Sequence, residues 1–269
     1  MFALDPFKVL LPAIVSFAIG IIIAPAIGRF LVSNKLWKKK NVTKTIDGKE
    51  ATITASLHND EKLPVPRLGG IVVWVSVFMT ALLFWFMSKV FPSHVTEKLV
   101  FISRNQTWLP LMAMLVGALV GALDDLLVVE AFGSKLNSYI GGGLSFPIRL
   151  IAVSALGLFA GWWFYAKLGV ESVYMPFYGH IHLGGLIFIA FFVLVTLATF
   201  STGVIDGVDG LSGGVMSAVF TAYGMIAYAH GQVDIAALCF VILGGIMAFL
   251  WFNIPPALFY LTETGMLSL

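Results

Sequence analysis

The chain has 269 residues, of which 59% are hydrophobic and only 11% are charged, and its formal net charge is +2. Soluble domains carry about 25% charged residues, so this composition excludes a single aqueous domain, and the sequence shows no nucleic-acid-binding pattern. Apolar runs of about 20 residues, the length that a bilayer requires, recur along the chain. We therefore predict an all-α, polytopic transmembrane helical bundle that forms one integral membrane domain over residues 1–269.

Seven helical spans are predicted, in chain order at residues 8–33, 67–91, 108–124, 148–167, 184–203, 210–230 and 234–252. The first span is too long for the apolar region of a cleavable signal peptide and lacks a small-residue cleavage site. The single cysteine, Cys239, lies in the last run and is interpreted as a small buried apolar residue. No disulfide can form within the chain.

The connection after the first span is strongly basic. It holds eight of the 16 basic residues, namely Lys35, Lys38, Lys39, Lys40, Lys44, Lys49, Lys62 and Arg67. Cytoplasmic loops of membrane proteins carry an excess of Lys and Arg, so this loop is predicted to be cytoplasmic and the N-terminus to lie outside. Its polar part, residues 41–63, is predicted to be a cytoplasmic insert with a turn at Asp47-Gly48.

Alternation of the spans predicts the membrane face of each polar segment. The third, fifth and seventh spans should bring five acidic residues to the cytoplasmic face: Asp124, Asp125, Asp206, Asp209 and Glu263. A carboxylate at a membrane boundary is costly to desolvate unless it is compensated, so these five are candidate catalytic residues. Residues 168–183 should form an external loop or hairpin around Gly179. His180 and His182 within it are interpreted as surface histidines.

The first motif is Gly-Ala-Leu-Asp-Asp at residues 121–125. Adjacent carboxylates repel each other, and a cation beside them relieves the repulsion. Hard oxygen ligands suit Mg²⁺, which also shares the phosphate oxygens of a substrate. A simple acidic helix end is the alternative interpretation, although an Asp pair at a helix C-terminus opposes the helix dipole.

The second motif is the string Asp-Gly-Val-Asp-Gly at residues 206–210, after the fifth span. Glycine lets the backbone approach a ligand closely, which favours a ligand-binding loop. Alternatively, Asp209 caps the helix that follows.

Two further motifs should lie at the same membrane face. Asn253 and Pro255 end the seventh span, and Tyr260 and Glu263 follow in a short loop. The alternative to a functional loop is an ordinary connection that ends at a proline. The second span opens with Pro-Val-Pro-Arg-Leu-Gly-Gly at residues 64–70. A positive-inside anchor would explain Arg67, but not the glycine pair.

At these four places, over about residues 64–265, the sequence resembles the polyprenyl-phosphate N-acetylhexosamine-1-phosphate transferase superfamily, glycosyltransferase family 4. The superfamily includes GlcNAc-1-phosphate transferases and phospho-N-acetylmuramoyl-pentapeptide transferases. The resemblance implies a Mg²⁺-dependent enzyme of the plasma membrane, here the bacterial inner membrane. It would transfer a sugar-1-phosphate from a UDP-N-acetylhexosamine donor to polyprenyl phosphate, releasing UMP, in cell-wall or surface-glycan synthesis. A homodimer is left open.

The resemblance also implies roles for the acidic motifs. Asp124 and Asp125 match the family's paired aspartates, implicated in the acceptor phosphate and the metal, and which of them is the base stays open. Asp206 and Asp209 match a motif that lines the nucleotide pocket. The residues between them, Gly207 and Val208, would contact uracil through the backbone.

The remaining roles implied by the resemblance concern the C-terminal motif and one arginine. Asn253 matches the Asn of a Phe-Asn-x-x-Pro-Ala motif of the nucleotide site, and Tyr260 falls where an aromatic ring stacks on uracil. Glu263 takes the place of a metal-binding Asp, so that the metal would be held by Glu263 and Asp125. Arg149 follows a Gly-Leu-Ser stretch and would contact the lipid phosphate.

The sequence departs from the family pattern in three ways. Thr262-Glu263-Thr264 replaces the usual Gly-Asp form, so the acid reaches one methylene further. Gly203 stands where an asparagine is expected, which leaves one nucleoside contact in doubt. Family members continue with further spans and a His-bearing loop, so the chain is expected to be C-terminally truncated.

Two choices remain open at this stage. The Pro-Arg-Leu-Gly-Gly form favours the GlcNAc-type branch, with phospho-N-acetylmuramoyl-pentapeptide transfer as the alternative. A secondary transporter is the rival from another class, but transporter sites lie near the bilayer midplane. An intramembrane aspartyl protease is a second rival. Its paired aspartates should lie within the spans, whereas Asp124 and Asp206 are predicted at span ends.

Overall fold

The computed structural model describes residues 5–37, 65–102, 105–129, 144, 146–175, 177–201 and 209–269. In this part of the chain six helices are long and apolar enough to cross a membrane. They are α1 (Asp5–Ser33), α3 (Ile71–Val90), α5 (Asn105–Val128), α7 (Phe146–Leu168), α9 (Leu211–Ala229) and α10 (Val233–Asn253). The shorter elements are α4 (His94–Leu99), β1 (Ser172–Met175), β2 (Gly179–His182), α8 (Gly185–Ser201) and α11 (Thr262–Met266).

The predicted all-α, polytopic membrane bundle is confirmed, and the protein is a multi-pass membrane protein. Each of the seven predicted spans coincides with a helix. The fifth of these helices, α8, has 17 residues and is about 26 Å long at 1.5 Å per residue, a little less than the bilayer core of about 30 Å. The face of the membrane on which the N-terminus lies stays a prediction.

The difference from the predicted boundaries that bears on the site is at α5. This helix continues to Val128 rather than ending at Asp124, so the acidic pair lies inside its last turns. Carboxylates at a helix C-terminus are unfavourable unless cations compensate them. Two arginines from other parts of the chain supply that compensation, as described below, and a sequence pattern cannot show such contacts.

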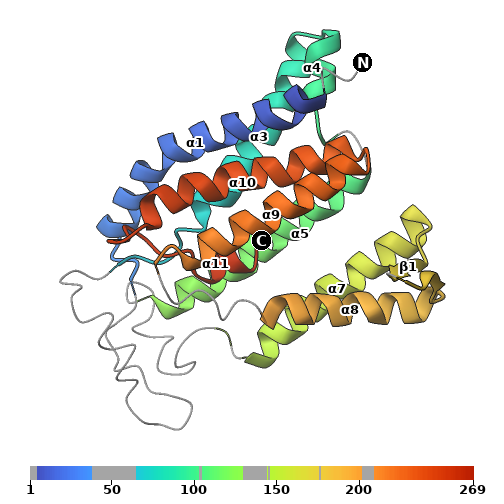
Figure 1. Cartoon of the computed structure of the whole chain (residues 1–269). Coiled ribbons are helices and arrows are strands. Elements are labelled where there is room, and N and C mark those ends of the chain that lie inside the picture. The colour runs from blue at the N-terminus through green and yellow to red at the C-terminus, as the bar shows by residue number, and fades with distance from the viewer. Residues whose placement is uncertain are drawn as a thin grey trace.

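Helix α10 is the central element of a bundle that also contains α1, α3, α5 and α9 (Figure 1). Of its best 18-residue window, 61% is buried, against 22% for α1 and 17% for α7. Small residues let the neighbouring backbones approach α10 closely. A side chain at Gly244 would clash with the carbonyl of Ala13 on α1, and one at Gly245 would meet Val73 on α3.

Helices α7 and α8 form an antiparallel pair that extends away from this bundle (Figure 1). Gly157 and Gly161 of α7 lie against the backbone of Val193 and Ile189 on α8, which brings the two helices close together. A two-stranded antiparallel hairpin, β1–β2, connects them. It lies in the segment for which the sequence predicts a hairpin around Gly179; its external location stays a prediction.

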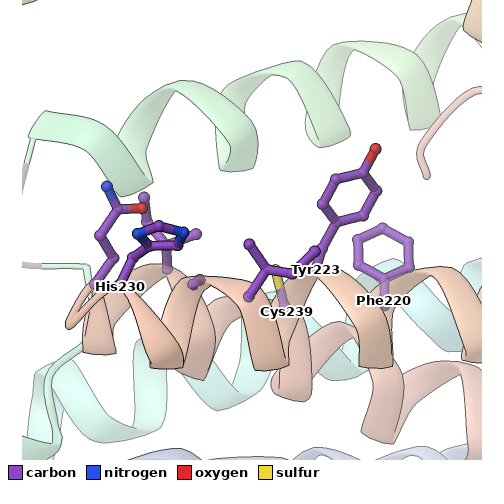
Figure 2. A pocket seen from close by; sticks show the side chains of 8 residues that line it. Phe220, Tyr223, His230 and Cys239 are labelled. Carbon is purple, nitrogen blue, oxygen red and sulfur yellow. The ribbon is translucent and has the colours of Figure 1, made fainter. Parts of the chain in front are cut away.

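A pocket of about 320 Å³ opens between the second half of α9 and the first half of α10. Figure 2 shows its lining, which is formed by Phe220, Tyr223, Ile226, Ala227, His230, Gln232, Ile235 and Cys239. None of the candidate site residues lines it. The pocket therefore does not bear on the predicted phosphate chemistry.

Candidate functional site

The described members of the four motifs meet at one end of the bundle. Arg67 lies just before α3, Asp124 and Asp125 lie near the end of α5, Arg149 lies at the start of α7, and Glu263 lies in α11. The hydrogen bonds and ion pairs below join these residues directly. These residues share one end of the bundle because α5 runs in the opposite direction to α3 and α7. The end of α5 therefore lies beside the starts of α3 and α7.

Asp125 is enclosed by donors from two distant segments. Its Oδ1 accepts hydrogen bonds from Nε and Nη2 of Arg67, at 3.0 and 2.9 Å. Its Oδ2 accepts from the Thr262 hydroxyl at 2.5 Å, from the Thr264 hydroxyl at 2.6 Å and from the Thr264 backbone N–H at 2.9 Å. The side chain of Asp125 is fully buried.

Five donors fill the hydrogen-bonding capacity of this carboxylate, which has about four lone-pair sites. These donors surround Asp125 in the described structure, and its predicted role as a metal ligand stays a prediction. Its contacts instead join α5, the start of α3 and α11. The structure thus separates the two members of the acidic pair, which the sequence alone treats as equivalent.

Asp124 and Glu263 share one cation, the guanidinium of Arg149. Nη2 of Arg149 lies 2.9 Å from Oδ2 of Asp124, and Nη1 lies 2.7 Å from Oε1 of Glu263. The backbone N–H of Leu144 donates to Oδ1 of Asp124 at 2.5 Å, and Nε of Arg149 donates to the carbonyl of Leu144 at 3.2 Å. Arg149 is thus held between two acids from separate helices.

Exposure differs along this triad. The side chain of Asp124 is fully buried, whereas those of Arg149 and Glu263 are 21% and 25% exposed. Burial raises the pKa of Glu263, Arg149 lowers it, and Asp124 and Asp125 raise it further. A ligand can therefore reach Glu263 and Arg149 from solvent, and a positive charge would favour the ionised form of Glu263.

The chemistry of Asp124 and Glu263 fits a hard divalent cation, because both offer carboxylate oxygens around a position that already holds a positive group. Among the described residues, no group of three or more His, Cys, Asp or Glu side chains lies close enough to form a metal site on its own. A cation here would therefore depend on two carboxylates, with oxygens of a substrate or water completing its coordination.

Helix α11 lies in a shallow seat on α5 that two glycines create. A side chain at Gly117 or Gly121 would clash with the carbonyl of Leu267 or Glu263, respectively. A side chain at Gly70 would likewise clash with Gly265. The glycine pair at residues 69 and 70, which a positive-inside anchor does not explain, is thus needed for close packing of the α11 segment.

The sequence reasoning missed Thr262 and Thr264 as site residues. Thr262 has φ 54°, in the left-handed region that favours glycine. Its hydroxyl compensates by bonding in two directions, donating to Asp125 and accepting from the N–H of Leu68 at 3.1 Å. The signal was present, since two threonines flank Glu263 in the sequence.

Asn253 fastens the start of α9 to the loop after α10. Its Oδ1 accepts from the N–H of Gly210 at 2.9 Å, and its Nδ2 donates to the carbonyl of Phe259 at 2.9 Å. Its exposed fraction is 2%. Both ends of the amide are therefore engaged in joining these two segments. The predicted contact of Asn253 with a nucleotide stays a prediction.

Asp209 lies beside the same loop. Its Oδ2 accepts from the N–H of Ala257 at 3.3 Å, and among the described residues its buried Oδ1 has no hydrogen-bond partner. The N-cap of α9 is Gly210, with φ 76° and no side-chain cap. The alternative interpretation of Asp209 as a helix cap is therefore not what the structure shows.

Tyr260 is half-buried and ties this loop to the segment before α3. Its N–H donates to the carbonyl of Pro66 at 3.0 Å, and its carbonyl accepts from Gly69 at 2.8 Å. Its predicted stacking on uracil stays a prediction. Asp206, Gly207 and Val208, and the predicted insert at 41–63, lie outside the described residues.

Comparison with known proteins identifies relatives. The family described as Glycosyl transferase family 4 matches residues 107–269. The chain is 30% identical over 217 residues to a phospho-N-acetylmuramoyl-pentapeptide-transferase of Levilactobacillus brevis, covering 78% of this chain and 60% of that protein. It is 32% identical over 229 residues to the protein of that name from Streptococcus pneumoniae strain 70585, covering 82% and 63%. The chain thus spans about 60% of the length of these curated relatives.

Proposed function

The chain belongs to glycosyl transferase family 4, and we propose that its protein transfers a sugar-1-phosphate from a UDP-linked donor to polyprenyl phosphate at the membrane surface. The observation that carries this proposal is the triad of Asp124, Arg149 and Glu263 at one end of a membrane bundle. Such a site offers both a cation for phosphate and carboxylates for a metal, next to the lipid that holds the acceptor.

The names of the relatives favour one donor. All the similar curated proteins described above are phospho-N-acetylmuramoyl-pentapeptide transferases. We therefore take UDP-linked N-acetylmuramoyl-pentapeptide as the donor, which was the alternative at the sequence level, in place of the GlcNAc-type donor that the Pro-Arg-Leu-Gly-Gly form favours. The lipid-linked product would serve peptidoglycan synthesis.

In the proposed reaction an oxygen of the acceptor phosphate attacks the β-phosphorus of the donor. A new diphosphate bond forms, the bond between the β-phosphorus and the bridging oxygen breaks, and UMP leaves with that oxygen. In phosphoryl transfer, positioning and charge neutralisation supply most of the catalysis. Arg149 carries the partly exposed cation that would hold the acceptor phosphate, and Asp124 would orient it.

Asp125 has a different part in this proposal. Because Arg67, Thr262 and Thr264 occupy its oxygens, Asp125 fixes the distance between α5 and α11 and therefore between Asp124 and Glu263. Asp124 is accordingly the better candidate for the carboxylate that receives or directs a proton. Asp206, Asp209, Gly207 and Val208 keep their proposed place at the nucleotide.

Asp124 and Glu263 would hold the Mg²⁺ ion, which when bound supplies charge neutralisation for the donor diphosphate. Arg149 would give up its contact with at least one of these acids as the ion and substrate bind. This arrangement supports an enzyme rather than a secondary transporter, since the described acids lie at helix ends and transporter sites lie near the midplane.

The test is an assay of the complete protein in detergent or vesicles with radiolabelled UDP-N-acetylmuramoyl-pentapeptide, polyprenyl phosphate and Mg²⁺, with UDP-GlcNAc in a parallel reaction. We expect lipid-linked product from the first donor, and its loss in Asp124→Asn and Glu263→Gln proteins that still insert into membranes. Full turnover in both variants would remove the basis of the proposal. Product from UDP-GlcNAc alone would move the donor to the other branch.

A further inference from the structure

The β1–β2 hairpin exposes large apolar side chains at its tip. Phe177 is fully exposed (104%) and Tyr178 is 81% exposed, more than any other Phe, Tyr or Trp in the described part of the chain. Tyr174 and Met175, which precede them, are also exposed. A cluster of apolar groups of this kind marks contact with a protein partner or a membrane.

The backbone of the tip holds one bulky residue in an unfavourable conformation. Phe177 has φ 72°, in the left-handed region where bulky residues are outliers. Gly179, two residues later, has φ 83° and meets no such conflict. Strain of this type recurs at functional sites, so the exposed ring of Phe177 is a candidate contact residue.

The place of the hairpin favours lipid as the contact of this ring. The hairpin joins α7 to α8, and only residues 169–171 and 183–184 separate its strands from these apolar helices. The last turns of α7 carry Trp162 and Tyr165, residue types enriched where helices leave the bilayer. The tip thus lies within reach of the membrane interface, continuous with the lipid-facing surface of the helix pair.

The strand register gives the hairpin two unlike faces. Val173 pairs with Ile181, whereas Tyr174 pairs with His180. Side chains alternate between the faces of a strand, so one face is aliphatic and the other combines an aromatic ring with an imidazole, in edge contact at 5.3 Å between centroids. An amphipathic hairpin of this type suits a position in the headgroup layer.

We propose that this hairpin is a lipid-interface anchor: Phe177 and Tyr178 insert at the boundary between headgroups and acyl chains and fix the depth of α7. The helix pair extends away from the bundle (Figure 1), and only 17% of the best window of α7 is buried. Most of the surface of α7 in this window is therefore not covered by the other described helices.

The anchor has a consequence at the other end of α7. Arg149 lies in the first turn of this helix, and the hairpin follows its last turn. Fixing the hairpin at one membrane face sets the depth at which Arg149 meets Asp124 and Glu263. The catalytic importance of this depth rests on the proposed function. The depth of Arg149 itself can be measured without an assay of activity.

The first experiment places a fluorophore on the tip. In a Cys239→Ala background, single cysteines at positions 177 and 171 are labelled with bimane in nanodiscs of phosphatidylethanolamine and phosphatidylglycerol. Glu171 is an exposed residue just before β1 and serves as the control. We expect brominated lipids to quench the probe at 177 at least twofold more than the probe at 171, and iodide to do the reverse.

Equal quenching of the two probes by iodide, without quenching by brominated lipid at 177, would overturn the anchor. Protection of the 177 probe from both quenchers would overturn it in favour of a protein partner. Neither readout depends on transferase activity, so failure of the proposed function would leave this result interpretable.

The second experiment tests the depth of α7. A cysteine replaces Ile148, which is exposed beside Arg149, and its reaction with a membrane-impermeant thiol reagent is timed. We expect the double change Phe177→Asp and Tyr178→Asp to alter this rate severalfold, and Phe177→Trp with Tyr178→Trp to leave it unchanged. An unaltered rate in the Asp variant, with retained size-exclusion behaviour, would overturn the control of Arg149 depth by the hairpin.

Discussion

The hydroxyl of Thr262 donates to Oδ2 of Asp125 at 2.5 Å, across 137 positions of sequence. This bond, with its neighbours from Thr264 and Arg67, fastens the segment after the last span to the end of α5. The acidic pair at 124 and 125 is consequently divided between a buried anchor and a residue that faces Arg149. The predictions below follow from that division.

Asp125→Asn should destabilise the protein more than Asp124→Asn. The NH₂ group of the new amide would take the place either of Oδ2, which accepts three hydrogen bonds, or of Oδ1, which accepts from Arg67. A buried donor that loses its acceptor costs about 1–3 kcal/mol. Thermal unfolding in detergent, followed by tryptophan fluorescence, measures the difference. Equal midpoints for the two variants would contradict the division of roles.

Substitutions at Thr262 should separate strain from hydrogen bonding. Thr262→Gly relieves a left-handed conformation that costs on the order of 1–3 kcal/mol but loses the hydroxyl. Thr262→Val keeps the strain, removes one of the donors to Asp125, and leaves the N–H of Leu68 without its acceptor. We expect stability in the order wild type, Gly, Val, measured by the same unfolding experiment. A Val variant as stable as the Gly variant would show that the left-handed conformation costs little, and a Val variant as stable as wild type would show that the hydroxyl contributes little.

Gly121→Ala should displace α11, because a Cβ at this position would clash with the carbonyl of Glu263. Gly214→Ala is the matched control: it also lies in a helix, and a Cβ there meets nothing within 4 Å. We expect Gly121→Ala to lower the unfolding midpoint and to abolish product formation. The control should be neutral or stabilising by up to about 1 kcal/mol, through helix propensity.

Arg149→Gln should strengthen the binding of a divalent cation. The guanidinium now stands between Asp124 and Glu263, and its removal leaves two carboxylates without a counter-charge. Mn²⁺ binding, followed by electron paramagnetic resonance without substrate, should tighten severalfold in the variant. The same variant should lose acceptor use in the assay. Weaker Mn²⁺ binding in Arg149→Gln would place the cation elsewhere.

Acid should release this cation at a higher pH than an ordinary glutamate would allow. Burial and the neighbouring aspartates raise the pKa of Glu263, so a proton competes with the ion while an exposed glutamate would still be ionised. Bound Mn²⁺ lowers that pKa in turn, since it favours the charged form. Mn²⁺ binding measured between pH 4 and 7 should fall on acidification, and the fall should shift to lower pH as Mn²⁺ concentration rises.

The family and the architecture were readable from the sequence. Apolar runs of about 20 residues predict helices that cross a membrane. Each predicted span coincides with a helix of the structure. The basic loop after the first span and the acids after the odd spans predicted that these termini share one face. The contacts of Arg67 with Asp125 and of Arg149 with Glu263 show that the described termini do lie together.

Which acid pairs with Arg149 and which is enclosed by Arg67, Thr262 and Thr264 was decided by the tertiary structure alone. Adjacent aspartates on a helix point in different directions, about 100° apart at 3.6 residues per turn, so their partners come from different helices. No local pattern reports that Thr264 will meet Asp125, or that Arg149 will lie between Asp124 and Glu263. Composition and period determine where a chain crosses the membrane, whereas the identity of each buried partner depends on packing between segments far apart in sequence.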